Sequence, residues 1–436
     1  MFRTSVSFAL LLSVSGAAQA GRALTVDDAL GLALKESPDL RAAQLQAEAS
    51  GDRAKSVRGH LLPAINLQDE FQHYNKPFVI QFPTGPTTPP LNFQARDNDT
   101  NTFVAGFDQP ITGLFHIIPD YMAASAAADA SSYDAKTATS ALREGVRTGF
   151  LRYFEAKSAE AIAKASEDQL AEQLQVTDAK FKAGTVTTAD VLRLKVAAAN
   201  ARQQEIAAQA QAQVVKANVL TIIGLRANDP EIELVEPTQL EAQAASATAP
   251  EFDQARESAL KRRPEIMSAA AQQSAANRTR YARWFNLLPE ADLEGAYLNI
   301  TGQVFAPKEQ WFIGIKASWR IWEWGSDYYA GRAAGAQAEA AAAQASSRAD
   351  QVEVDVATKL SNLTAVQGSF DAATAAIASA EEAFRVTQAL VKAGTATTTD
   401  LLDAQSALTT ARQNLNRATY ERAIAQVALQ RTTGQD

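Results

Sequence analysis

The sequence predicts a mainly α-helical protein with a small β part, built from two copies of one structural unit. Three observations predict it. The stretch Phe181–Arg193 (FKAGTVTTADVLR) returns 210 residues later as Val391–Asp403 (VKAGTATTTDLLD). Long segments rich in Ala, Gln and Glu flank both copies, which favours extended helices. Four short segments alternate apolar and polar residues, and this period of two is typical of β-strands.

The first twenty residues have the composition of a secretory signal peptide. Arg3 precedes an apolar stretch at residues 8–14, and Ala18-Gln-Ala20 has the small-residue pattern of a cleavage site. The apolar stretch is too short to cross a membrane as a helix. We therefore assign residues 1–20 to a signal peptide and expect the mature chain to begin at Gly21.

Composition argues against several functional classes. The chain has 0 Cys, which excludes thiol nucleophiles and Cys-based metal sites, and its formal net charge of −8 argues against nucleic acid as a partner. The three histidines, His60, His73 and His116, lie outside any metal-binding spacing, and no phosphate-binding or dinucleotide-binding motif occurs. We predict no catalytic residues, no cofactor and no metal, and therefore not an enzyme.

The first repeat is expected at residues 21–224. A helix at residues 24–59 should break before Pro38, because Pro is tolerated in the first turn of a helix. A β-hairpin at residues 64–112 follows, with Ile65, Leu67 and Phe71 on one face of its first strand. Residues 76–101, which are rich in Pro and polar side chains, are predicted to form a long exposed loop within this hairpin.

The first repeat ends in a helical hairpin with its tip at residues 183–188. Helices are expected from about residue 114 to the tip and from the tip to residue 223. Gly184 favours a left-handed helix end, and the Thr and Asp residues after it favour an N-cap for the next helix. A helix of about 67 residues is on the order of 100 Å long. Helices of that length need partners along their whole length, which favours a coiled-coil-like array.

The second repeat, residues 251–434, follows a linker at residues 225–250 that is rich in Pro. Its β-hairpin is expected at residues 290–321, with Trp311, Trp319 and the alternate residues between them on one face. A helical hairpin follows, with helices from about residue 325 and from Thr398 on either side of a tip at residues 393–398.

The strands indicate a membrane location for the β part. Each strand has roughly ten residues with apolar side chains on one face, as in outer-membrane strands. Aromatic residues gather near the strand ends, which resembles the girdle at a membrane interface. We assign Trp311, Trp319, Trp322 and Trp324 to this girdle. The alternative is a soluble antiparallel sheet with one buried face, and the helices alone would also fit an elongated structural coiled coil.

The strand count constrains the assembly if the strands span a membrane. Four strands cannot close a barrel, because about eight are the minimum. An open sheet edge cannot persist in lipid. Several chains must therefore share one barrel, and three chains would supply twelve strands. Trimerisation is a geometric consequence that depends on the membrane interpretation.

Taken together, these features resemble the TolC family of outer-membrane channel-tunnel proteins. The resemblance covers almost the whole mature chain and is carried by the duplicated order of elements and by Lys392–Ala404 (KAGTATTTDLLDA). It implies a homotrimer in the outer membrane that extends into the periplasm, with a 12-stranded β-barrel in lipid and a long α-helical coiled-coil barrel. It also implies two protein partners: a periplasmic adaptor (membrane fusion) protein and an inner-membrane transporter of the RND, ABC or MFS type.

The resemblance assigns roles to three aspartates. Asp400 and Asp403 match an inward-facing pair, which in a trimer would form a charge ring at the periplasmic entrance, and Asp190 matches a residue that latches this entrance. The sequence departs from the family pattern at Val391 and Ala396, where a Tyr and an Arg are expected. The latch is therefore incomplete. The structural alternative for Asp190 and Asp400 is helix capping.

The two tips are the predicted docking points for the adaptor. The residues assigned to this role are Lys182, Gly184, Thr185, Lys392, Gly394 and Thr395. The alternative is a plain turn with no partner. Our leading hypothesis is a passive exit duct for efflux or type I secretion, and its substrate would be set by the pump. The competing hypothesis is a periplasmic coiled-coil protein, structural or adaptor-like, without a pore.

Overall fold

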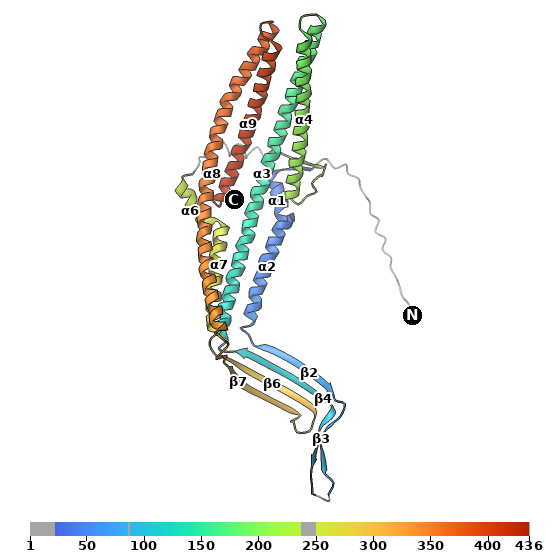
Figure 1. Cartoon of the computed structure of the whole chain (residues 1–436), viewed down its shortest axis with the longest axis vertical. Helices are drawn as coiled ribbons and strands as arrows, with labels where there is room; N and C mark the ends of the chain where they lie inside the picture. Colours follow the sequence, from blue (N-terminus) through green and yellow to red (C-terminus); the bar gives the residue numbers. More distant parts are fainter. Residues whose placement is uncertain (1–21, 86–87, 237–249, 436) are drawn as a thin grey trace, which may run out of the picture. The chain divides into compact units, whose positions relative to one another are not determined.

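The computed structural model describes residues 22–85, 88–236 and 250–435 (Figure 1). The expected signal peptide and most of the expected linker therefore lie outside the described residues. The chain forms two compact units, which we call the helical unit and the sheet unit. The helical unit comprises Met1–Pro38, Thr139–Ala255 and Val356–Asp436, and the sheet unit comprises Asp39–Ala138 and Arg256–Asp355. Each unit thus takes segments from both predicted repeats.

Proline marks two helix starts, of which the sequence predicted the one at Pro38. Helix α1 (Val26–Glu36) ends just before Ser37, and α2 (Pro38–Gly59) begins with Pro38. In the second half, α6 (Phe252–Arg262) is followed by α7 (Pro264–Phe285), which has Pro264 in its first turn. Pro fits there because the first amides of a helix have no intrahelical acceptor to lose.

The sheet unit contains one five-stranded sheet. Strands β2 (Ala64–His73), β4 (Leu91–Pro110), β6 (Glu290–Gln303) and β7 (Glu309–Ser318) lie in that order and are antiparallel, and β3 (Phe78–Phe82) pairs with the outer part of β4. The predicted loop at residues 76–101 is therefore wrong. Most of that segment forms β3 and the first half of β4, because cross-strand pairing overrides the local preference of Pro-rich and polar sequence for loops.

The register of the sheet places apolar residues of β2, β4, β6 and β7 on one face. Ile65 pairs with Phe107, Phe107 with Gly295, and Gly295 with Ile313. The next row on the same face joins Leu67, Ala105, Tyr297 and Trp311. This face is open: Ile313 is 64% exposed and Trp311 74%. Single exposed apolar side chains are common on soluble proteins, but a continuous apolar surface is not. Such a surface indicates that a membrane or another protein covers it.

Strand β7 ends at Ser318, so the predicted strand end at residue 321 is wrong. The antiparallel partner sets this limit, because β6 begins at Glu290 and Glu290 pairs with Ser318. Beyond that residue no neighbouring strand is available to accept hydrogen bonds. Residues 319–325 lead instead into helix α8 (Ser326–Lys392).

The helical unit is built from two helical hairpins. One is the C-terminal part of α3 (Leu114–Lys182) with α4 (Thr188–Ile222), and the other is the C-terminal part of α8 with α9 (Thr398–Thr432). Polar contacts join α9 to α3 along its length: Gln405 donates to Gln169 at 2.8 Å, Asn416 to the Glu155 carbonyl at 3.0 Å, and Arg431 to Glu144 at 2.7 Å. Of the helices in the described ranges, none is long and apolar enough for a membrane span.

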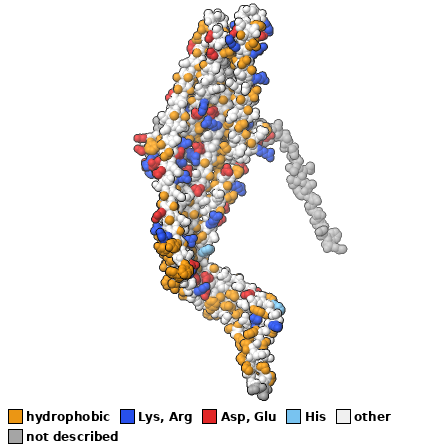
Figure 2. All heavy atoms as spheres, in the orientation of Figure 1, with side chains coloured by type: hydrophobic (Ala, Val, Ile, Leu, Met, Phe, Trp, Pro, Cys, Tyr) orange, Lys and Arg blue, Asp and Glu red, His pale blue; other side chains and the backbone are white. Residues whose placement is uncertain are grey.

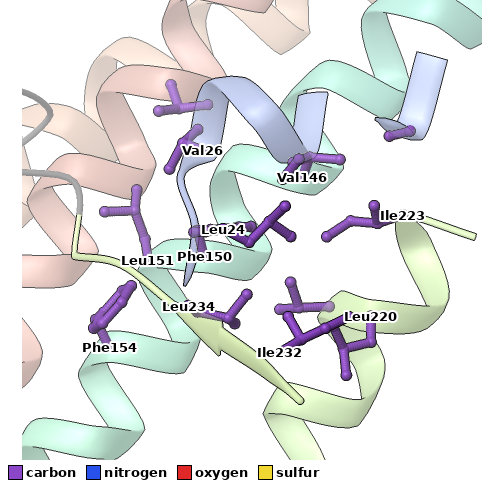
Figure 3. Close-up of a cluster of buried hydrophobic side chains, with 14 of the residues drawn as sticks. Leu24, Val26, Val146, Phe150, Leu151, Phe154, Leu220, Ile223, Ile232 and Leu234 are labelled. Atoms are coloured by element: carbon purple, nitrogen blue, oxygen red, sulfur yellow. The ribbon is translucent and has the colours of Figure 1, made fainter. Parts of the chain in front are cut away.

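The main core of the helical unit surrounds a small parallel sheet (Figure 3). Strands β1 (Arg22–Leu24) and β5 (Ile232–Leu234) pair there, and Leu24, Ile232 and Leu234 are buried against α3 and α4. Phe150 of α3 is fully buried in this core. Neither strand was predicted, since three residues carry no recognisable alternation, and β5 falls within the segment predicted to be a linker.

Candidate functional site

Each helical hairpin turns through the same Gly-centred C-cap. In the first, Gly184 has φ of +75°, its N–H donates to the Phe181 carbonyl at 2.9 Å, and the Thr185 N–H donates to the Lys180 carbonyl at 3.0 Å. In the second, Gly394 has φ of +78° and the Thr395 N–H donates to Leu390 at 3.0 Å. This pair of bonds is the Schellman motif, which satisfies carbonyls left free at a helix end and requires a left-handed residue. The sequence predicted this break at both glycines.

The helices that follow both tips begin with a capping box. Thr397 accepts a hydrogen bond from the Asp400 N–H at 3.2 Å, and Asp400 Oδ2 accepts from the Thr397 N–H at 2.8 Å and from its hydroxyl at 2.7 Å. Thr187 and Asp190 repeat the arrangement on α4. The capping alternative for these two aspartates is therefore confirmed as a structural role, because each carboxylate closes the first turn of its helix.

The capping bonds also set the ionisation of both aspartates. The Thr397 hydroxyl and then the Thr397 backbone N–H lower the pKa of Asp400 below its ordinary value of 3.8. The same two groups of Thr187 lower the pKa of Asp190, and Arg193 and the Thr398 side chain lower it further. Hydrogen bonds donated to a carboxylate favour its charged form. Both groups are consequently anionic at any physiological pH.

Arg193 connects the tip regions of the two hairpins. Its Nη1 lies 3.8 Å from Asp190 Oδ1 on its own helix and donates to the Thr399 hydroxyl on α9 at 3.4 Å. Arg193 was not among the residues predicted from the sequence to have a role. A signal was present, because Arg193 occupies in the first repeat the position that Asp403 occupies in the second. A reversal of charge between equivalent positions points to an interaction that only one repeat needs.

The remaining predicted tip residues differ in how free they are. Asp403, on α9, is exposed and forms neither a hydrogen bond nor an ion pair with the described residues. Lys182 is exposed and pairs with Asp178 at 2.7 Å. The hydroxyls of Thr185 and Thr395 bond to backbone carbonyls within their own turns. Asp403 is therefore the predicted charge-ring residue whose carboxylate is free to meet a solute or another chain.

A cavity of about 190 Å³ lies between the four helices just behind the tips. Its lining includes the apolar side chains of Leu194, Phe384 and Leu401 and the charged residues Lys180 and Lys392. Lys392 was predicted to dock an adaptor, but it also lines this internal space. The described residues contain no group of three or more His, Asp or Glu side chains placed to hold a metal ion.

The four girdle tryptophans are divided between the two ends of β7: Trp311 lies near the turn from β6, and Trp319, Trp322 and Trp324 follow the last residue of the strand, Ser318. Trp311 is on β7, and Trp319 donates its indole N–H to the Leu287 carbonyl at 3.3 Å. Trp322 and Trp324 contact each other edge to face with ring centres 5.9 Å apart. All four are well exposed. Only Trp311 belongs to a strand, and the other three lie in the connection between β7 and α8.

Two helical hairpins with matched tips and a sheet with one apolar face define a membrane-associated channel protein of the duplicated tunnel type. The sequence matches the family described as outer membrane efflux protein over residues 29–225 and 255–435. The chain belongs to this family. It is therefore an outer-membrane efflux channel that extends into the periplasm and not an enzyme, and the resemblance recognised in the sequence is confirmed.

Solved structures share this fold at low sequence identity. The Campylobacter jejuni CmeC outer membrane channel is 17% identical with a TM-score of 0.80, over 99% of this chain and 94% of CmeC. The Vibrio cholerae outer membrane protein VceC is 15% identical with a TM-score of 0.78, over 94% and 96%. The open state of the Neisseria gonorrhoeae MtrE channel is 18% identical with a TM-score of 0.76, over 94% and 88%. None of the curated protein sequences matches the chain.

Proposed function

We propose that three copies of the chain form one continuous exit duct, which receives substrate from an inner-membrane pump through a periplasmic adaptor and releases it outside the cell. The observation that carries the proposal is the sheet: four long strands with one exposed apolar face and two edges, β2 and β7, that pair with no further strand among the described residues. A sheet of this kind in lipid needs a partner at each edge, because unpaired backbone groups are too costly there.

The strand directions allow this closure. The order β2-β4-β6-β7 is antiparallel throughout, so β2 and β7 run in opposite directions. The β7 edge of one copy then meets the β2 edge of the next in antiparallel fashion, and three copies close a barrel of twelve strands. In this arrangement the apolar face meets lipid. The opposite face, with Gln68 of β2 and Lys316 of β7, lines the lumen.

Helix α4 offers a second surface for assembly. Leu192, Val196, Ile206 and Val214 are each more than half exposed although they are large and apolar. Together with Ala199 and Ala210 they lie three, four or seven residues apart, which makes one stripe along the helix. A stripe with this spacing is the seam of a coiled coil. It supports a neighbouring chain packed along α4.

The tips are the proposed entrance and docking points. They present the same rigid turn twice per chain, so a trimer carries six nearly equivalent tips for an adaptor. Asp403 is the free carboxylate of the proposed charge ring, and Asp400 adds negative charge beside it. The contact from Arg193 to Thr399 holds the two hairpins of one chain together, and we assign to Arg193 the closing role that Val391 and Ala396 leave open.

Reconstitution into planar bilayers tests the duct. We expect heat-resistant trimers on gels and discrete conductance steps that favour cations, with weaker cation preference in Asp403→Asn. Recovery of the mature chain from the soluble periplasm as a non-conducting species would instead support the coiled-coil alternative. Site-specific crosslinking from the tips in cells then identifies the adaptor, and the adaptor's pump distinguishes small-molecule efflux from type I secretion.

A further inference from the structure

An aromatic and basic patch lies in the sheet unit where helices α7 and α8 adjoin the sheet. Trp284 of α7 and Tyr328 of α8 contact edge to face, with ring centres 6.0 Å apart. Gly331 makes this packing possible, because a Cβ there would approach the Trp284 ring to 3.1 Å. Both rings remain partly open, with Trp284 36% and Tyr328 48% exposed. We call this contact the junction aromatic pair.

Two arginines flank the junction aromatic pair. Arg280 precedes Trp284 by four residues on α7 and Arg332 follows Tyr328 by four on α8, so each lies about one helical turn from its aromatic neighbour along the same helix. Both are exposed, and neither forms an ion pair with any residue that the structure describes. Figure 2 shows Lys and Arg side chains bordering a dense hydrophobic surface at this end of the helices.

Helix electrostatics do not account for Arg332. A cation is favoured in the last turn of a helix, and Arg283 of α7 occupies such a position. Arg332, by contrast, lies in the second turn of α8, near the positive end of the helix dipole. The chain as a whole is acidic, with a net charge of −8. Unpaired positive charge at this place therefore indicates an anion that the isolated chain lacks.

We propose that Arg280 and Arg332, with the junction aromatic pair, bind the phosphate groups of phospholipids in the leaflet next to the helices. The patch continues the apolar face of the sheet, since Trp319 at the end of that face bonds to the Leu287 carbonyl just after α7. Trp and Tyr prefer the depth of the lipid headgroups. Arginine there extends its charge to the phosphates while its stem stays on apolar surface. The inference rests on the membrane placement of the strands in the proposed function.

Native mass spectrometry of the delipidated full-length protein tests this proposal. The test variant is Arg280→Gln/Arg332→Gln. The matched control is Arg41→Gln/Arg348→Gln, which removes the same charge from exposed positions on α2 and α8 outside the patch. We expect phosphatidylglycerol affinity to fall about fivefold per arginine in the test variant, to stay unchanged in the control, and to weaken with salt.

Two results would overturn the proposal. The first is equal phosphatidylglycerol affinity of the test variant and the wild type. The second is displacement of phosphatidylglycerol from the wild type by millimolar inorganic phosphate, which would show a site for a free anion. Bilayer conductance separates this proposal from the duct. The test variant should conduct normally. If the wild type binds phosphatidylglycerol through the patch but does not conduct, the proposed duct is contradicted and the phospholipid site is not.

Discussion

Arg193 on α4 donates a hydrogen bond from Nη1 to the Thr399 hydroxyl on α9, at 3.4 Å. The two residues belong to different repeats, so the bond links the two helical hairpins of one chain near their tips. The same guanidinium lies 3.8 Å from Asp190. The exposed side chain of Arg193 thus contacts the first turns of both helices: Asp190 at the start of α4 and Thr399 at the start of α9.

Loss of this contact should loosen the proposed entrance. An exposed polar contact of this kind contributes about 0.5–1 kcal/mol, so Arg193→Ala should raise the open fraction of single channels roughly two- to fivefold. Arg202→Ala is the matched control, because Arg202 lies on the same helix but pairs with Glu167 of α3, 3.9 Å away, and not with α9. Identical open fractions in wild type and Arg193→Ala would contradict the closing role.

Bulky replacements at the tip glycines should abolish export while trimers still form. A Cβ at Gly394 meets nothing within 4 Å, so the cost of Gly394→Val is backbone strain at a φ of +78°. For a β-branched residue that strain is on the order of 1–3 kcal/mol, enough to change the turn but not the fold. Export assays and gel mobility of the heated and unheated protein measure the two effects.

Two further variants distinguish the effect of losing the left-handed turn from the effect of replacing a glycine elsewhere. Gly394→Asn should retain most export, because Asn tolerates the left-handed conformation. Gly368 lies inside α8, and a Cβ added there would meet nothing within 4 Å. Gly368→Ala should therefore stabilise the helix by about 0.5–1 kcal/mol. Full export by Gly394→Val would show that the tip geometry is not used for docking.

The capping boxes predict a specific loss of order in acid. Because the pKa of Asp400 is lowered in the folded state, the stabilisation it adds is fully present above the ordinary carboxyl value of 3.8. It declines as the pH falls below that value and is gone once the pH is below the folded-state pKa. Hydrogen exchange of peptides at the start of α9, corrected for intrinsic rates, should show this decline.

Asp400→Asn provides the control for this pH effect. Asparagine is itself a hydrogen-bonding side chain but does not titrate, so the first turn of α9 should exchange faster than in the wild type and with no change between pH 5 and pH 2, apart from effects of the whole fold. If exchange at the start of α9 still rises in acid in Asp400→Asn as it does in the wild type, other carboxylates cause the rise.

The sheet register predicts opposite tolerance at neighbouring positions of β2. Leu67 lies on the apolar face, in the row that ends at Trp311, and its neighbour Gln68 lies on the opposite face. Leu67→Lys should cost about 2–4 kcal/mol in a bilayer, whereas Gln68→Lys should cost less than about 1 kcal/mol. Urea unfolding in lipid vesicles measures both. Equal costs would mean that the apolar face does not meet lipid.

Local sequence was sufficient wherever one helix end or one strand decides the structure. The break at Gly184 follows from a residue that adopts positive φ, and the cap at Thr397 and Asp400 follows from a spacing of three residues. Strand β2 was recognisable because its side chains alternate. The order of the duplicated elements was enough to indicate the family, which the match over most of the chain confirms. The repeat boundaries themselves stay a prediction, as do the functional roles of the tips.

Pairing between distant segments could not be predicted from the sequence. Strand β3 and the outer half of β4 form from residues that favour loops, since hydrogen bonds to a partner outweigh weak local preference. Strands β1 and β5 are too short to show a period and meet only because the core around Phe150 brings them together. Arg193 gained a partner in the same way, from a helix more than two hundred positions away. The sequence alone determined the helices, their caps and the family, because those depend on neighbours along the chain. Tertiary structure decided which edges, faces and charges meet, because those depend on neighbours in space.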